Sequence, residues 1–251
     1  MYKASFISFS LLLNLAVAQS NDELYQNGLE CRKNYKIQEG FDIFSKLMKA
    51  DSSNSMYIAY GRYFYSRVRA QQKSDAEKMK YYKKAEYLSR KAIKLDDQNP
   101  EAHYAYALAL GRINENASSS EKIKNSKLIK KEADRTIALE PKHAGAYHIL
   151  GRWHRTIAGF NAMEKAMINT FYGGVPPGGS YEESAKAFQN AIVHEPDYIL
   201  HFYELGLTYH EMGKDSFARG FLEKALKLPN KTPEDEENKR KCSDLLKKLK
   251  G

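Results

Sequence analysis

The side chains that most often carry enzyme or metal chemistry follow no catalytic or metal-binding pattern in this chain. The seven histidines form no H-E-x-x-H motif, and they do not join Cys31 and Cys242 in a Cys/His cluster. No G-x-S-x-G, P-loop or dinucleotide-binding glycine motif occurs. We therefore expect a protein that is not an enzyme, with no catalytic residue, no metal ion and no cofactor.

Arginine and aromatic residues recur in a pattern suited to binding an acidic ligand. A guanidinium group binds a carboxylate or a phosphate through two parallel hydrogen bonds, and aromatic rings add apolar contact area. The candidate ligand-groove residues are Arg62, Tyr104, Arg112, His148, Arg152, Arg155, Tyr203 and His210. They indicate an acidic peptide, a chain-terminal carboxylate or an anionic lipid head group. In the alternative interpretation, these arginines pair with acidic side chains of neighbouring helices.

These positions follow from a sequence repeat. Tyr147, Leu150, Gly151 and His154 stand at the W-x2-L-G-x2-Y signature positions of a tetratricopeptide repeat. The other copies are centred on Gly28, Gly61, Ala107 and Gly206. In such arrays the first helices of successive repeats line a concave groove, and the repeat register places the candidate residues there.

The repeats define the predicted fold. We expect an all-α, tetratricopeptide-like helical-hairpin solenoid of about five repeats, in a single domain over residues 19–251. The predicted repeats span about residues 22–51, 54–97, 101–141, 144–196 and 199–230, and a capping helix spans 233–250. Residues 114–126 are rich in Ser, Asn and Lys, which predicts a loop. Thr232 is expected to cap the last helix at its N-terminus.

The fourth repeat carries an apolar insertion. Phe160, Met163, Met167 and Phe171 recur at helical spacing, which predicts that the preceding helix continues to residue 171. A Gly- and Pro-rich segment then ends this helix. The apolar stripe is either part of the core or a lid over a ligand cavity. The lid interpretation favours a lipid carrier or a membrane tether.

Composition indicates a folded protein with a basic surface. Hydrophobic residues make up 42% and charged residues 28% of the 251 residues, which argues against global disorder. The net charge of +9 favours acidic partners. We predict an acidic protein or peptide partner, with an anionic lipid as an alternative, and no nucleic acid. A basic face that only binds solvent is the competing interpretation.

The first residues have the pattern of a signal peptide. Lys3 supplies a positive end, residues 4–15 form a short apolar run, and Ala16-Val17-Ala18 predicts cleavage before Gln19. Residues 1–18 are therefore predicted to be a signal peptide and the protein to be exported, to the periplasm or by secretion. No later stretch is apolar enough to cross a bilayer.

From about residue 97 to 249 the chain resembles the regulator of microtubule dynamics family. The resemblance is carried by the segments Ala146–Trp153 (AYHILGRW), Glu182–Ala185 (EESA) and Leu228–Asp235 (LPNKTPED). It implies an all-helical interaction domain and, in animals, association with microtubules or organelle membranes. An export signal would separate this chain from tubulin. The cytoplasmic, cytoskeleton-associated role implied by the family therefore requires that the N-terminal segment is retained.

Three hypotheses follow. The first is a non-enzymatic interaction scaffold that binds an acidic or amphipathic partner in the concave groove. The second is a lipid carrier or membrane tether, and the third is a microtubule-associated protein as in the animal family.

We expect the native protein, purified from its own compartment, to begin at Gln19, because the A-x-A pattern directs cleavage there. Intact-mass spectrometry measures this directly. A native protein that retains Met1 would contradict the export prediction and favour the microtubule hypothesis.

Overall fold

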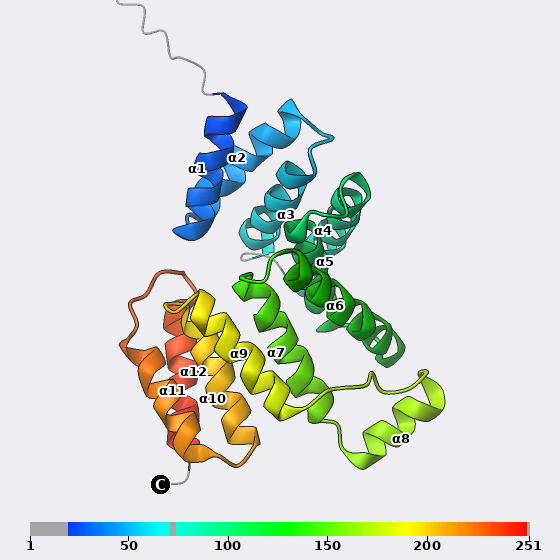
Figure 1. The fold of residues 1–251 in the computed structure, drawn as a ribbon, viewed down its shortest axis with the longest axis vertical. Coiled ribbons are helices and arrows are strands. Elements are labelled where there is room, and N and C mark those ends of the chain that lie inside the picture. The colour runs from blue at the N-terminus through cyan, green and yellow to red at the C-terminus, as the bar shows by residue number, and fades with distance from the viewer. Residues whose placement is uncertain (1–19, 71–73, 250–251) are drawn as a thin grey trace, which may run out of the picture.

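The computed structural model describes residues 20–70 and 74–249, which contain α-helices and no β-strand (Figure 1). The helices are α1 (Asn21–Lys33), α2 (Ile37–Ala50), α3 (Ser55–Ala70), α4 (Asp75–Leu95), α5 (Pro100–Asn114), α6 (Ser119–Leu139), α7 (Ala144–Ala158), α8 (Ala162–Phe171), α9 (Tyr181–His194), α10 (Ile199–Glu211), α11 (Asp215–Lys227) and α12 (Asp235–Lys248). The predicted all-α, tetratricopeptide-like solenoid is confirmed. The predicted signal peptide lies outside the described residues. No helix in the described ranges is long and apolar enough to span a membrane.

The helices pack as successive hairpins. α1 packs on α2, α3 on α4, α5 on α6, α7 on α9 and α10 on α11, and each hairpin also contacts the next one. α12 packs on both α10 and α11, where Cys242, Leu245 and Leu249 complete the last hydrophobic cluster. This final helix covers apolar surface that the last hairpin would otherwise expose to water.

Short polar side chains decide where several helices begin. Ser118 and Glu121 bond reciprocally across the first turn of α6, so this helix begins at Ser119 and the predicted loop over 114–126 is wrong beyond residue 118. Asn161 and Glu164 form the same arrangement at α8. α7 therefore ends at Ala158, and the predicted continuous helix to residue 171 is also wrong.

The start of α12 differs from the prediction as well. The Asp235 carboxylate accepts the backbone N–H groups of Lys231 and Thr232 at 2.8 and 2.7 Å. The Thr232 hydroxyl has no hydrogen-bond partner, so Thr232 does not cap the helix, and α12 begins at Asp235.

Small residues on the first helices allow rings on the second helices to pack closely. A Cβ atom added at Gly151 would lie 2.7 Å from the ring of Phe188, which has no solvent exposure. Gly28 faces Phe44, and Gly206 faces Leu222, in the same manner. The repeat signature therefore reflects close packing between the two helices of a hairpin.

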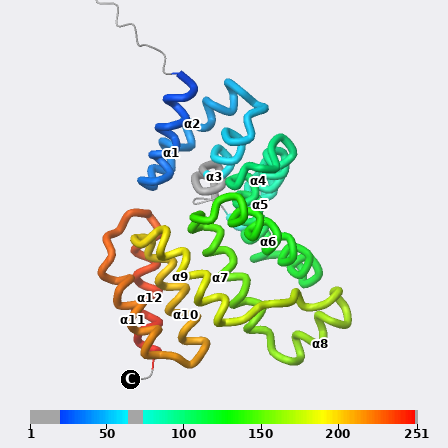
Figure 2. Tube along the Cα trace, viewed as in Figure 1, coloured from blue at the N-terminus to red at the C-terminus, as the bar shows by residue number. Residues whose placement is uncertain are grey.

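The array curls until its first repeat meets its last. The rings of Tyr35, just after α1, and Tyr198, just before α10, stack with their centroids 5.9 Å apart. Figure 2 shows the end of α1 approaching the connection between α9 and α10. Tyr35 has a φ of 55°, a left-handed conformation that glycine adopts more easily after a helix. The two ends of the array therefore meet across the concave side.

We predict opposite effects for two glycine-to-alanine substitutions within helices. Gly151→Ala should lower the free energy of unfolding by about 1–3 kcal/mol, because its methyl group overlaps the Phe188 ring. Gly111→Ala, which meets no atom within 4 Å, should raise it by about 0.5–1 kcal/mol. Urea unfolding followed by circular dichroism measures both. Equal effects at the two positions would contradict the packing role of Gly151.

Candidate functional site

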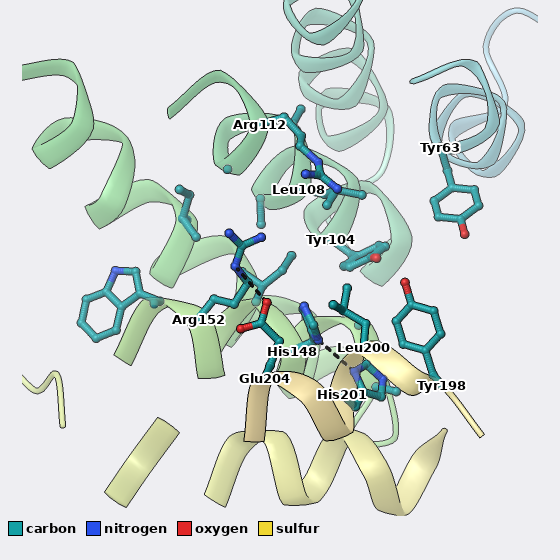
Figure 3. Close-up of a pocket in the computed structure, with 18 of the residues that line it drawn as sticks. Tyr63, Tyr104, Leu108, Arg112, His148, Arg152, Tyr198, Leu200, His201 and Glu204 are labelled. Atoms are coloured by element: carbon teal, nitrogen blue, oxygen red, sulfur yellow. Dashed lines mark hydrogen bonds and ion pairs between the residues drawn. The ribbon is translucent and has the colours of Figure 1, made fainter. Parts of the chain in front are cut away.

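The concave side holds a cavity of about 1590 Å³ (Figure 3). Six predicted groove residues line it, and they are Arg62, Tyr104, Arg112, His148, Arg152 and Tyr203. They come from the first helices of four successive hairpins, α3, α5, α7 and α10. Pockets for small molecules usually measure about 300–1,000 Å³, so this cavity can hold a larger occupant.

Arg112 and Arg152 are accessible arginines of the cavity, whose lining also includes exposed lysines such as Lys33 and Lys241. The two arginine side chains are 47% and 50% exposed, and both point into the cavity in Figure 3. Arg112 pairs with Glu115 at 3.1 Å, and Arg152 lies 3.8 Å from a Glu204 oxygen. Half-exposed pairs of this kind hold a guanidinium only weakly. Both arginines therefore retain donors for an incoming anion.

Arg155 has a structural role, and its prediction as a groove residue is corrected. Its guanidinium bonds the Glu204 carboxylate, donates to the Glu204 carbonyl at 2.9 Å and to Thr208 at 3.3 Å, and lies 3.7 Å from Glu211. The side chain is 13% exposed and does not line the cavity. For Arg155, the alternative of ion pairing between helices is the right one, because it ties α7 to α10.

His210 is corrected in the same way. Its Nδ1 lies 2.8 Å from a carboxylate oxygen of Asp215, at the junction of α10 and α11. It does not line the cavity. The prediction placed His210 in the groove, but the part of α10 that lines the cavity ends before this residue.

Two histidines meet in the cavity floor. The Nδ1 atoms of His148 and His201 are 2.8 Å apart, so one ring donates a hydrogen bond to the other, and His201 Nε2 lies 3.2 Å from the Glu195 carboxylate. Burial lowers the pKa of His148 well below its usual value, and His201 and Arg152 lower it further. His148 is therefore an uncharged hydrogen-bonding group at neutral pH. Sequence reasoning missed His201, because no motif marks it.

A buried carboxylate organises the other end of the cavity. Glu101, 1% exposed, accepts from Arg32 Nη1 at 2.6 Å, and the same oxygen lies 3.3 Å from His143 Nε2. Burial alone would raise the pKa of Glu101, but Arg32 and His143 outweigh it and hold the pKa below its usual value. The Arg32 guanidinium also lies within 6 Å of three tyrosine rings, those of Tyr60, Tyr63 and Tyr104. The candidate set also missed Arg32 and Glu101.

The predicted apolar lid does not form. Phe160 lines the cavity, but Met163, Met167 and Phe171 do not. These three side chains are 81%, 45% and 73% exposed on α8, which projects from the array in Figure 1. The core interpretation is wrong for them too. Helical spacing correctly placed them on one face, but the cap at Asn161 redirects the chain and turns that face to solvent.

The described residues contain no group of three or more His, Cys, Asp or Glu side chains that could hold a metal ion. Cys31 and Cys242 are both buried free thiols. Within the described part of the chain, the cavity therefore offers hydrogen-bonding, charged and apolar groups.

We predict that two neighbouring arginines differ sharply in their contribution to stability. Arg155→Met should lower the free energy of unfolding by about 3–5 kcal/mol, because it leaves the buried Glu204 carboxylate without its main partner. Arg152→Met is the control, three residues earlier on the same helix. It should lower the free energy of unfolding by less than about 1 kcal/mol. Urea unfolding measures both values. A small loss at Arg155 would restore it as a groove candidate.

Comparisons with known proteins agree with this architecture. The family model of regulator of microtubule dynamics protein 1-3 matches residues 17–250. Regulator of microtubule dynamics protein 1 of Bos taurus is 27% identical over 239 residues, which cover 92% of this chain and 70% of that protein. Regulator of microtubule dynamics protein 3 of Xenopus laevis is 25% identical over 231 residues, 91% of this chain but 48% of that protein. This chain therefore spans only about half the length of that relative.

One solved structure supports the fold independently. A thermophilic tetratricopeptide-repeat protein of Thermus thermophilus superposes with a TM-score of 0.56 and 13% identity, over 90% of this chain and 100% of that one. At this identity the likeness concerns the fold alone. Since the family model matches nearly the whole sequence, the chain belongs to the regulator of microtubule dynamics protein 1-3 family.

Proposed function

We propose that this protein is a non-enzymatic scaffold that binds an acidic, amphipathic segment of a partner protein in its concave cavity. The observation that carries the proposal is the pair Arg112 and Arg152, whose half-exposed guanidinium groups point into one large cavity from adjacent hairpins. Their planar donor sets match carboxylates, so an acidic segment gains directional hydrogen bonds as well as charge attraction.

Apolar side chains between the cations explain why the segment should be amphipathic. Leu108, Ile149 and Leu200 line the same cavity, together with Tyr104 and Tyr203. Figure 3 shows Leu108 beside Arg112, and Leu200 beside the two histidines. A segment with acidic side chains on one face and apolar side chains on the other satisfies both parts of this surface.

Family membership supports a protein partner over a small substrate. The relatives are named for the regulation of microtubule dynamics, and microtubules are a partner for this chain if its N-terminal segment is retained. If that segment is removed as a signal peptide, the acidic partner is an exported or extracellular protein. The lipid-carrier alternative loses its predicted lid, because Met163, Met167 and Phe171 face solvent.

We predict that the protein binds a short fluorescein-labelled peptide of glutamate and leucine, and that a lysine and leucine peptide does not bind. Arg112→Gln and Arg152→Gln should each weaken binding by about 10- to 100-fold, because each removes a charge-assisted hydrogen bond worth about 1.5–3 kcal/mol. Fluorescence anisotropy at fixed ionic strength measures the dissociation constants.

Lys214→Gln and Lys227→Gln are the matched controls. Both lysines are exposed near the ends of α11, and neither lines the cavity. They remove the same net charge, so an equal loss of affinity in these variants would show that overall basicity, and not the cavity, attracts the peptide. Unchanged affinity in Arg112→Gln and Arg152→Gln would overturn the proposal.

A further inference from the structure

Arg62, on α3, is a buried charged side chain without a partner. It has no solvent exposure, and none of its three guanidinium nitrogens has a hydrogen-bond partner. Among the described side chains, those of residues 20–63 and 74–249, Arg62 has no ion-pair partner. The residue nevertheless lines the concave cavity. Its guanidinium thus lies directly beneath the cavity wall with all its donors unused.

Such a group is costly to the folded protein. Buried polar groups are almost always hydrogen-bonded, and a buried charge without a partner costs several kcal/mol relative to its exposure in water. Burial lowers the pKa of Arg62 to about 10, with Glu101 acting in the opposite direction, so the group is still charged at neutral pH. The free-energy cost of this unpaired charge is removed if Arg62 gains a hydrogen-bond partner when a ligand occupies the cavity.

The neighbouring groups do not neutralise Arg62. Among the acidic groups, Glu101 has the largest electrostatic effect on Arg62, but its Oε2 already accepts from Arg32 and faces His143. Its Oε1 is buried and has no hydrogen-bond partner either. Glu140 and Glu195 also line the cavity, but the three guanidinium nitrogens of Arg62 donate to neither of them.

We propose that Arg62 binds one carboxylate group of the ligand that occupies the concave cavity. A carboxylate offers two acceptor oxygens that match the planar fork of a guanidinium. Glu101 repels a phosphate group, which carries close to two negative charges, more strongly than it repels a carboxylate.

The size of the group matters because Arg62 has no exposed area. Side chains of the cavity wall must shift when a ligand reaches it, and a small planar group requires the smallest shift. This inference rests on the proposed function for the identity of the ligand, and it adds the position at which one carboxylate of the acidic segment is held.

The experiment measures thermal unfolding of the full chain in sodium acetate and in sodium chloride at equal ionic strength. Acetate at roughly ten times its dissociation constant should raise the Tm of the wild type by about 3–5 °C over chloride. Arg62→Met should raise the Tm in chloride by about 5 °C, because it removes an unpaired buried charge at similar volume, and should abolish the acetate effect. In the peptide assay it should weaken binding about tenfold or more.

Arg90→Met is the matched control, because Arg90 is exposed on α4 and does not line the cavity. It should leave both the Tm in chloride and the acetate effect unchanged. An Arg62→Met variant that unfolds, that loses stability, or that keeps the acetate effect would overturn the proposal. Stabilisation by sodium phosphate that exceeds that by acetate and depends on Arg62 would overturn the choice of a carboxylate.

The two proposals fail in different ways. A wild type that does not bind the acidic peptide but gains an Arg62-dependent stabilisation from acetate would reject the scaffold function and keep the carboxylate site. Peptide binding that depends on Arg112 and Arg152 but not on Arg62 would keep the scaffold function and reject the site.

Discussion

The carboxylate of Glu101 joins three helices that lie far apart in the chain. It accepts from Arg32 at the end of α1, 69 residues away, and faces His143 at the start of α7, 42 residues away. A buried carboxylate is tolerated only when it is paired, so these helices are held at positions that keep the pairing intact. His143 also caps α7 through a bond from the Ala146 N–H, which couples the cluster to the start of that helix. The curvature of the array, and with it the cavity, depends on this interaction.

The stacking of the Tyr35 ring on the Tyr198 ring joins the first hairpin to the last one, in addition to the contacts of Glu101. Together the ion pair and the stack bring the two ends of the array together, so side chains that point inward line one cavity that stays partly open to solvent. Closure has a further consequence for charge. In a low-dielectric interior an unpaired cation is attracted more strongly to an incoming anion than it would be on an open surface.

The arginines of the inner face fall into two groups because of this geometry. Arg155 is held by Glu204 and Thr208 of the neighbouring helix, where it stabilises the contact between α7 and α10. Arg112 and Arg152 face the cavity with weaker partners. Arg152 and Arg155 both lie on α7, so a single helix can join the repeats and also present charge to the cavity, and a basic composition alone does not distinguish the two roles.

The sequence by itself determined the all-helical fold and the repeat register, and it placed six of the eight candidate groove residues on the side that lines the cavity. These features depend on interactions within each hairpin, such as the close packing of Gly151 against Phe188, which recur from one repeat to the next. The sequence also placed Met163, Met167 and Phe171 on one helical face. It did not reveal that this face is exposed, because a cap at Asn161 turns α8 away from the array.

Only the tertiary structure decided which polar side chains meet. Arg152 and Arg155 lie less than one turn apart on α7, yet Arg155 is held tightly and Arg152 is not. Their partners come from α10, whose position depends on how the hairpins stack. Likewise, the contacts of Arg32 with Glu101 and of His148 with His201 join residues 69 and 53 positions apart. Such pairings depend on the accumulated rotation from one repeat to the next. A local sequence pattern carries no information about that rotation, and it therefore could not show that Arg62 is left without a partner.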